Sequence, residues 1–252
     1  MVDGRRLTFR LAGINNQNFV MRDEQTGSWW QQVSGRAFLG PLSGKRLRLV
    51  PHDQITYATW KAERPGGRVL RPDMASEKDD NYAPPDWEAH MAKARVPAGM
   101  IRGQVPRGLE PRTLIVGIDL NGRSVAWPHG SVVAAGATVG DVGGVPVLIV
   151  AAQDGKSVRA FDRRVSGQPL TFVRAGADVR TSTLLDLETM SEWNFAGRAT
   201  AGEHAGAQLT RIEILLDYWF DWKNYHPETV VVAPWTGKPK PARTEIPPPV
   251  DQ

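Results

Sequence analysis

The sequence predicts a mainly β protein of two related β-rich units, an internal duplication, with short helices. Three observations lead to this fold class. A stretch at residues 7–70 recurs at residues 170–232. Short runs of alternating apolar and polar residues are separated by glycines and prolines, and Asn121-Gly122 is a strong hairpin signal. Because the repeat period is far too long for a solenoid, we interpret the pattern as a duplicated domain.

The repeat consists of ordered identities with a single one-residue gap. Leu7-Thr8-Phe9 matches Leu170-Thr171-Phe172, and the gap follows Trp30. We expect the tryptophans that recur to pack in the core. Further identical pairs are Asp23 and Asp186, Thr26 and Thr189, Ser28 and Ser191, Trp30 and Trp193, Gly35 and Gly197, Ala37 and Ala199, Trp60 and Trp222, Lys61 and Lys223, and Pro65 and Pro227.

The first copy should contain four strands, a turn and a short helix. Asp23 and Gly27 are typical of the two ends of a turn, and Pro65 should end the helix because it supplies no amide donor. The expected elements are strands at 7–11 and 19–21, a turn at 23–27, a strand from Trp29, a strand at 47–50 and a helix at 55–63.

The remaining sequence divides into a connector, a complete second unit and a tail. The connector is rich in proline and charge, with one expected helix at 87–94 capped by Asp86. The continuous apolar run at 145–152 is typical of a central strand. The predicted domains are the C-terminal half of a first repeat unit at 1–70, the connector at 71–112, a complete second repeat unit at 113–235 and a disordered tail at 236–252.

Composition excludes several classes of function. No apolar run approaches the roughly 18 residues of a membrane span, and no secretory signal opens the sequence as written. The absence of cysteine excludes disulfides and thiolate ligands, and the five histidines are too far apart for a metal site. Residues 1–72 carry 12 Lys/Arg against 5 Asp/Glu, a net +7 within a total of +4, but such a count more often marks a solvated surface than a nucleic-acid site.

Several motifs together resemble a bacterial domain-of-unknown-function family, family 3179 (DUF3179). The resemblance covers residues 7–70 and 113–232 and implies no activity, because the family has no established one. Its members are commonly exported, which suggests an extracytoplasmic location; the sequence itself assigns no compartment. The motifs are Val20-Met21-Arg22-Asp23, Gly27-Ser28-Trp29-Trp30, Gly40-Pro41-Leu42, Trp60-Lys61, Gly143-Gly144-Val145-Pro146-Val147, Ala160-Phe161-Asp162-Arg163-Arg164-Val165 and Leu170-Thr171-Phe172.

The chain also departs from the family pattern. Family units carry a Cys-Pro-x-Cys-Gly or Cys-Pro-x-Thr-Gly element, whose cysteine positions correspond here to Ala152 and Gly155. Val2 aligns with Val165, so Met1 falls in the middle of a unit. We expect either an N-terminal truncation that removes a half-unit equivalent to 113–164, or a natural half-unit completed by another chain, such as a homodimer.

One polar group in the first copy is a candidate ligand-binding site. Side-chain amides, a carboxylate and an indole could line a pocket for a small ligand. The alternative is that Asn and Asp only build turns through bonds to the backbone. The candidates are Asn16, Asn18, Asp23, Trp30 and Gln32. In the second copy, Val179 and Thr181 replace Asn16 and Asn18.

These observations favour a non-catalytic binding or scaffold protein whose partner is an unknown small ligand or protein. They assign no catalytic residue, cofactor or metal. The alternative is a truncated enzyme, or a redox or metal-binding protein, whose Cys and His residues lie in a missing N-terminal half-unit. Nucleic-acid binding is the least favoured class.

Overall fold

The computed structural model describes residues 1–252 except 16–17, 51, 71–85, 176–182 and 233–252. The described chain is mainly β, as the sequence predicted, with five sheets and four short α-helices. The expected tail at 236–252 and part of the expected connector lie outside the described residues. Among the described helices, none is long and apolar enough to cross a membrane.

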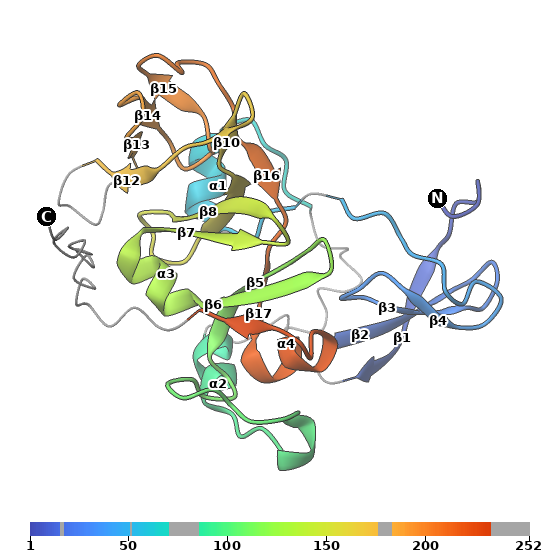
Figure 1. Ribbon diagram of the computed structural model, residues 1–252. Helices are drawn as coiled ribbons and strands as arrows, with labels where there is room; N and C mark the ends of the chain where they lie inside the picture. Colours follow the sequence, from blue (N-terminus) through green and yellow to red (C-terminus); the bar gives the residue numbers. More distant parts are fainter. Residues whose placement is uncertain (16–17, 51, 71–85, 176–182, 233–252) are drawn as a thin grey trace, which may run out of the picture.

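The first four strands form one antiparallel sheet in the order β1-β2-β3-β4 (Figure 1). Gly27 adopts a φ of 73° and ends the turn between β2 and β3, as its sequence position indicated. The expected strand at 47–50 is wrong: after the isolated bridge between Arg36 and Arg46, the chain leaves this sheet. The strands are β1 (Phe9–Asn15), β2 (Asn18–Asp23), β3 (Trp29–Gln31) and β4 (Ala37–Leu39).

A second sheet, β12-β13-β14-β15, has the same strand order and matching registers. Phe9 pairs with Asp23 in the first sheet, and Phe172 pairs with Asp186 in the second. Such recurrence is what the duplication interpretation expects. The strands are β12 (Phe172–Arg174), β13 (Leu184–Asp186), β14 (Glu192–Trp193) and β15 (Ala199–Ala201).

Two larger sheets make up the centre of the molecule, with orders β16-β9-β8-β7 and β17-β5-β6-β18. Asn121 and Gly122 adopt φ values of 51° and 74° in the hairpin between β5 and β6, as predicted. A small hairpin, β10 (Arg164–Val165) with β11 (Gln168–Pro169), follows β9. The other strands are β5 (Leu114–Leu120), β6 (Arg123–Pro128), β7 (Ala137–Val142), β8 (Val145–Ala151), β9 (Val158–Asp162), β16 (Thr210–Ile212), β17 (Leu215–Tyr218) and β18 (Val230–Val231).

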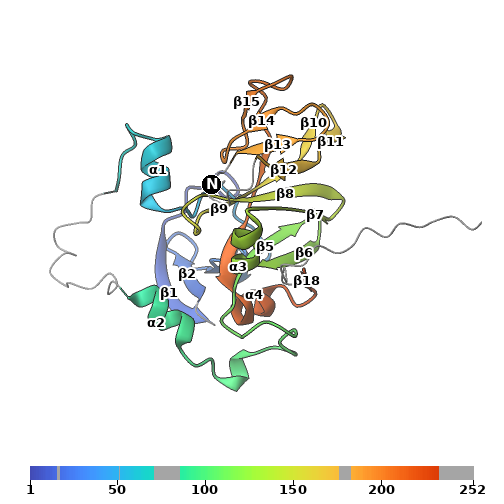
Figure 2. The same cartoon turned by 90° about the vertical axis from the view of Figure 1, so that its left-hand side faces the viewer.

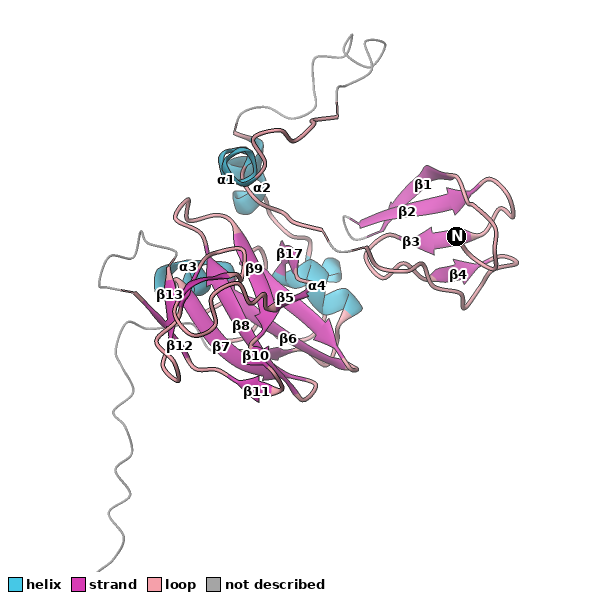
Figure 3. Ribbon diagram, turned by 90° about the horizontal axis from the view of Figure 1, so that it is seen from above, coloured by secondary structure: helices cyan, strands magenta, loops and turns pink. Residues whose placement is uncertain are grey.

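The two related sheets differ in what covers them. In Figures 1 and 2 the β12–β15 sheet lies over the sheet of β7, β8 and β9. Leu148, Val150 and Phe161 of β8 and β9 share one buried cluster with residues of this upper sheet, including Trp193. The β1–β4 sheet stands to one side of the other sheets (Figure 3), and Trp30 is buried in a separate small cluster.

The helices are short, and two of them end in the same way. Lys61 and Lys223 each donate a hydrogen bond to the carbonyl oxygen of a proline four residues later, just after α1 and α4. Asp86 occupies the N-cap position of α2, as expected, but its side chain makes no capping hydrogen bond. Helix α3 was not predicted. The helices are α1 (Tyr57–Glu63), α2 (Trp87–Lys93), α3 (His129–Ala135) and α4 (Trp219–Tyr225), with a 3-10 turn at Ala98–Met100.

The segment that contains α1 packs on the second half of the chain. Arg159, 4% exposed at its side chain, binds Asp53 and Glu63 at 2.9 Å and 2.6 Å. The Thr56 backbone N–H donates to Ser157 Oγ at 2.9 Å. Because Arg159 forms two bonds to each carboxylate, this contact fixes α1 against β9.

Candidate functional site

Asp23 and Trp30, two of the predicted site residues, are buried against each other inside the β1–β4 sheet. The indole Nε1 of Trp30 donates to Asp23 Oδ2 at 2.8 Å, and the Thr26 N–H donates to Asp23 Oδ1 at 2.6 Å. Burial alone would raise the pKa of Asp23, but these hydrogen bonds offset it and lower the pKa below its usual value. The carboxylate therefore remains ionised at neutral pH.

The second copy contains the same network. Trp193 Nε1 donates to Asp186 Oδ2 at 2.8 Å, and the Thr189 N–H donates to Asp186 Oδ1 at 2.6 Å. Both Asp23 oxygens accept hydrogen bonds from protein groups. This geometry favours the turn-building role that the sequence left open for Asp23.

The other predicted site residues lie elsewhere. Asn18 Nδ2 donates to Asp221 Oδ2 of α4 at 2.5 Å, across the junction between the β1–β4 sheet and the rest of the chain. Gln32 Oε1 accepts a long 3.4 Å bond from the Phe19 N–H. Asn16 lies outside the described residues. The described members of the predicted group therefore occupy two different environments.

Asn18 leads to a pair of carboxyl groups that we did not single out from the sequence. Asp217 lies in β17 and Asp221 in the first turn of α4, close enough for the charge of Asp217 to affect the pKa of Asp221. Asp221 is 3% exposed, and its Oδ1 has no hydrogen-bond partner in the described structure. Asp217 Oδ2 is likewise buried without a partner. Burying two carboxyl oxygens without hydrogen-bond partners lowers the stability of the folded state.

Burial has a large effect on this pair. Desolvation, with a smaller contribution from Asp217, raises the pKa of Asp221 to about 8, although the bond from Asn18 opposes the shift. Desolvation raises the pKa of Asp217 to about 7, against the lowering effect of the Tyr218 N–H. Tyr225, one turn further on, donates its hydroxyl to the Asn15 carbonyl at 2.9 Å. At neutral pH the pair therefore retains at least one proton.

The sequence offered only a weak signal for these residues. On the helix that the repeat predicts at 217–225, Asp217, Asp221 and Tyr225 follow at intervals of four, where they would share one face. The corresponding positions in the first copy are Ile55, Thr59 and Glu63. Because only the Trp and the Lys of this segment are identical in the two copies, the comparison does not single out these three positions.

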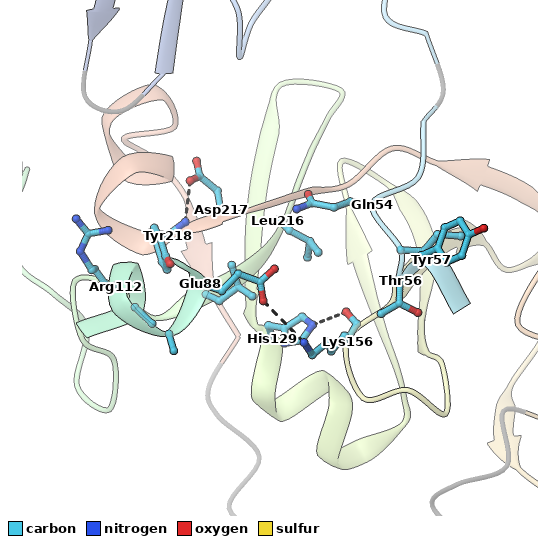
Figure 4. Close-up of a pocket in the computed structure, with 14 residues that line it drawn as sticks. Gln54, Thr56, Tyr57, Glu88, Arg112, His129, Lys156, Leu216, Asp217 and Tyr218 are labelled. Carbon is cyan, nitrogen blue, oxygen red and sulfur yellow. Dashed lines mark hydrogen bonds and ion pairs between the residues drawn. The ribbon is translucent and has the colours of Figure 1, made fainter. Parts of the chain in front are cut away.

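Asp217 also borders a cleft with a volume of about 950 Å³ (Figure 4). Its walls come from the segment before α1, from α2, from the start of β5, from the start of α3, from the loop between β8 and β9 and from β17. Apolar side chains line much of the cleft, with polar groups among them, which is typical of small-molecule sites. The lining residues are Gln54, Ile55, Thr56, Tyr57, Glu88, Ala89, Ala92, Arg112, Leu114, His129, Lys156, Leu216, Asp217 and Tyr218.

The charged groups of the cleft are held to different degrees. Arg112 is fixed: its Nε donates to the Ala94 carbonyl at 2.7 Å and its guanidinium lies 5.1 Å from the centre of the Tyr218 ring. Lys156 is loosely held, because its Nζ is 3.8 Å from Glu88 and the two side chains are 69% and 89% exposed. With the pKa of Asp217 raised to about 7, the cleft is weakly cationic near neutral pH.

The described residues contain no group of three or more His, Cys, Asp or Glu side chains that could hold a metal ion. His129 lies in the cleft, where its Nε2 is 2.9 Å from the Lys156 carbonyl oxygen.

Comparison with known proteins gives one match. The family described as "Protein of unknown function (DUF3179)" matches residues 1–229. No curated protein and no solved structure matches the chain.

Proposed function

Because the chain belongs to DUF3179, a family of unknown function, we propose a function from its own geometry. The protein is a non-catalytic binding protein that holds a small organic acid with an apolar body in the cleft bordered by β17 and α2. The cleft itself is the observation that supports this proposal, because six separate segments bring apolar walls and cationic groups together there.

The walls match the apolar part of such a ligand. Ala89 and Ala92 of α2 face the cleft together with Leu114 and Leu216 of the β5–β17 pair. Tyr57 adds an exposed ring at the start of α1. A cleft of about 950 Å³ is within the range of small-ligand sites, and burial of a ligand's carbon atoms here contributes roughly 25 cal/mol for each Å² removed from water.

Lys156 is the residue that selects a carboxylate. Its exposed ammonium group is close enough to Glu88 for only a weak ion pair, so a ligand carboxylate can replace Glu88 without stranding a buried charge. The Thr56 hydroxyl also lines the cleft (Figure 4), but it donates its proton to Asp154 Oδ2 at 2.6 Å, so Lys156 remains the group that pairs with a carboxylate. Arg112 adds positive charge from the opposite wall, although its own contacts hold it in place.

The group predicted from the sequence supports this proposal indirectly. Asn18 donates a hydrogen bond to Asp221, which follows the cleft residue Asp217 by four residues. Asp23 and Trp30 fix the sheet that carries Asn18. Direct ligand contact by these residues, by Gln32 or by Asn16 stays a prediction.

Binding of matched acids and amides tests the proposal. Hexanoate, benzoate and indole-3-acetate are titrated into the full chain by calorimetry, beside the corresponding neutral amides. We expect the acids to bind more tightly than the amides because only the acids pair with Lys156. Lys156→Gln should weaken acid binding by roughly 10- to 100-fold, the effect of losing a charge-assisted hydrogen bond, and leave amide binding unchanged.

Lys45→Gln is the matched control. Lys45 is also an exposed lysine in an ion pair, with Asp3 at 3.0 Å, but it lies in the β1–β4 part of the chain. This variant should bind the acids as the parent does. Equal binding of acids and amides, equal losses in the two lysine variants, or no binding at millimolar concentration would each refute an organic-acid site in the cleft.

A further inference from the structure

One face of the β1–β4 sheet is apolar and only partly covered. We call it the β1–β4 apolar face. Leu11 pairs with Met21, and Phe19 lies two residues before Met21 on the same strand, so their side chains share this side of the sheet. Leu11 is 60% exposed and Phe19 is 45% exposed. The face consists of Leu7, Phe9, Leu11, Phe19, Met21 and Leu47.

The related sheet shows what covers such a face. Leu170, Phe172, Leu184 and Leu209 occupy the positions of Leu7, Phe9, Met21 and Leu47 and are 4%, 8%, 1% and 1% exposed. They are buried because β8 and β9 place Leu148, Val150 and Phe161 on them. The corresponding residues of the first sheet are all partly exposed. Their cluster contains only described residues from Val2 to Leu47, so no strand from outside the sheet contributes to it.

A matched pair of glycines marks where a ring can enter. A Cβ atom on Gly197 would lie 2.5 Å from the Phe161 ring, so this ring rests directly on the glycine backbone. Gly35 has the corresponding position and a similar φ, 64° against 74°. The three heavy atoms nearest to a Cβ atom on Gly35 all belong to Leu47, at 3.4–3.8 Å, so no ring rests on this glycine. The first sheet therefore has the space that Phe161 fills in the second.

Charge distinguishes the two sheets and restricts the partner. Residues 1–50 contain 8 Lys/Arg and 3 Asp/Glu, a net charge of +5. Residues 170–212 contain 4 Lys/Arg and 5 Asp/Glu, a net charge of −1. Arg5 and Arg6 are exposed and directly precede Leu7 of the apolar face, whereas Arg10 alternates with Phe9 and Leu11 and so lies on the opposite side of the sheet. Two such basic sheets would repel each other, which disfavours a face-to-face pair of identical chains.

We propose that the β1–β4 apolar face is an interaction surface for a β-hairpin of another polypeptide. The hairpin presents Leu or Val from one strand and a Phe from the other, as β8 and β9 do. The residues around this apolar surface are acidic. Its Phe ring sits on Gly35, its aliphatic side chains cover Phe9 and Met21, and its acidic groups face the arginines near the N-terminus.

The first test is the association state of the chain alone. Sedimentation at increasing protein concentration should show a monomer, because the basic rims repel. A dimer that Leu11→Glu abolishes would overturn the proposal and assign the face to a second copy of the chain.

The second test supplies the hairpin. A copy of residues 113–164 is joined directly ahead of Val2, because Val2–Arg5 forms the same turn that Val165–Gln168 forms after β9. We expect amide hydrogen exchange in β1 and β2 to slow by at least about tenfold, which corresponds to about 1.4 kcal/mol. The control has Leu148→Asp and Phe161→Asp in the added copy only. Equal exchange in fusion and control would refute the surface.

The third test examines the acidic rim. In the added copy, Lys156→Glu and Arg164→Glu change two exposed residues to acids. This fusion should protect β1 and β2 more than the unmodified fusion at low salt, and the difference should shrink at high salt. If the acidic fusion protects β1 and β2 from exchange no more than the unmodified fusion at low salt, the acidic rim of the proposal is overturned.

Discussion

Replacing Asp221 by Asn should stabilise the protein, and the gain should depend on pH. The carboxyl group is 3% exposed, and only one of its oxygens has a hydrogen-bond partner. An asparagine side chain has nearly the same shape. Its oxygen can accept the bond from Asn18. The substitution therefore removes a buried ionisable group and keeps the hydrogen bond across the junction.

The sign and size of the effect follow from the pKa. Burial raises the pKa of Asp221 from 3.8 to about 8, so the folded state binds a proton that the unfolded state releases above pH 4. Stability therefore falls as pH rises from about 4 towards 8 and then levels off. At pH 7 the penalty is at most about 4 kcal/mol, from about three pKa units at 1.36 kcal/mol each. Structural relaxation reduces it, so we expect a gain of about 2 kcal/mol.

Urea unfolding at pH 4.5 and pH 7.5 measures the difference. The gain of Asp221→Asn over the parent should be at least about 1 kcal/mol larger at the higher pH. Asp3→Asn is the control, because Asp3 is an exposed carboxylate paired with Lys45. A gain of the same size at both pH values, or a loss at pH 7.5, would refute the reasoning that this carboxyl is destabilised by burial.

Three further predictions concern the framework. Arg159→Met should lower the free energy of unfolding by about 3 kcal/mol in urea titrations, because Glu63 loses this partner while Asp53 keeps only Arg211, whereas Arg164→Met, at an exposed ion pair, should cost less than about 1 kcal/mol. Gly117→Ala should lower the melting temperature, since its Cβ would lie 2.4 Å from the Trp222 ring; overpacking of this kind costs roughly 1–3 kcal/mol, and an unchanged melting temperature would contradict the packing. Asp23→Asn should cost about 1.5–3 kcal/mol at pH 7. Because the folded pKa of Asp23 is lowered, its stabilisation is present above pH 4 and is lost on acidification, so parent and variant should converge in acid unfolding curves.

Much of the local structure could be predicted because its causes are local. The turn at Asp23, the hairpin at Asn121-Gly122 and the central strand at 145–152 depend on neighbouring residues and alternation. Trp30, Trp193 and Trp222 are buried as expected from their recurrence. For Trp60 the expectation is wrong: no residue of α1 is buried, and this indole is only partly covered. Helix α3 was missed because its seven residues show little helical periodicity of apolar side chains. Its end depends on Gly136, which adopts a φ of 73°.

The candidate sites could not be predicted because their causes are distant. Asn18 was noticed for its polarity, but its partner Asp221 is 203 residues away. The unpaired oxygens of Asp217 and Asp221 follow from burial, which no spacing in the sequence reports. The cleft needs α2 and β17 to meet. Sequence comparison between the copies showed which residues had changed but not where they lie.

The contact of α1 with Arg159 has a consequence for synthesis on the ribosome. Asp53 and Glu63 are made 106 and 96 residues before Arg159. At 5–20 residues per second, these carboxylates wait roughly 5–20 s for their partner. A seven-residue helix does not persist alone in water, so α1 forms only after β9 has left the ribosome. The β1–β4 sheet, by contrast, takes its strands and its buried cluster from residues 2–47 and can form before β9 is made.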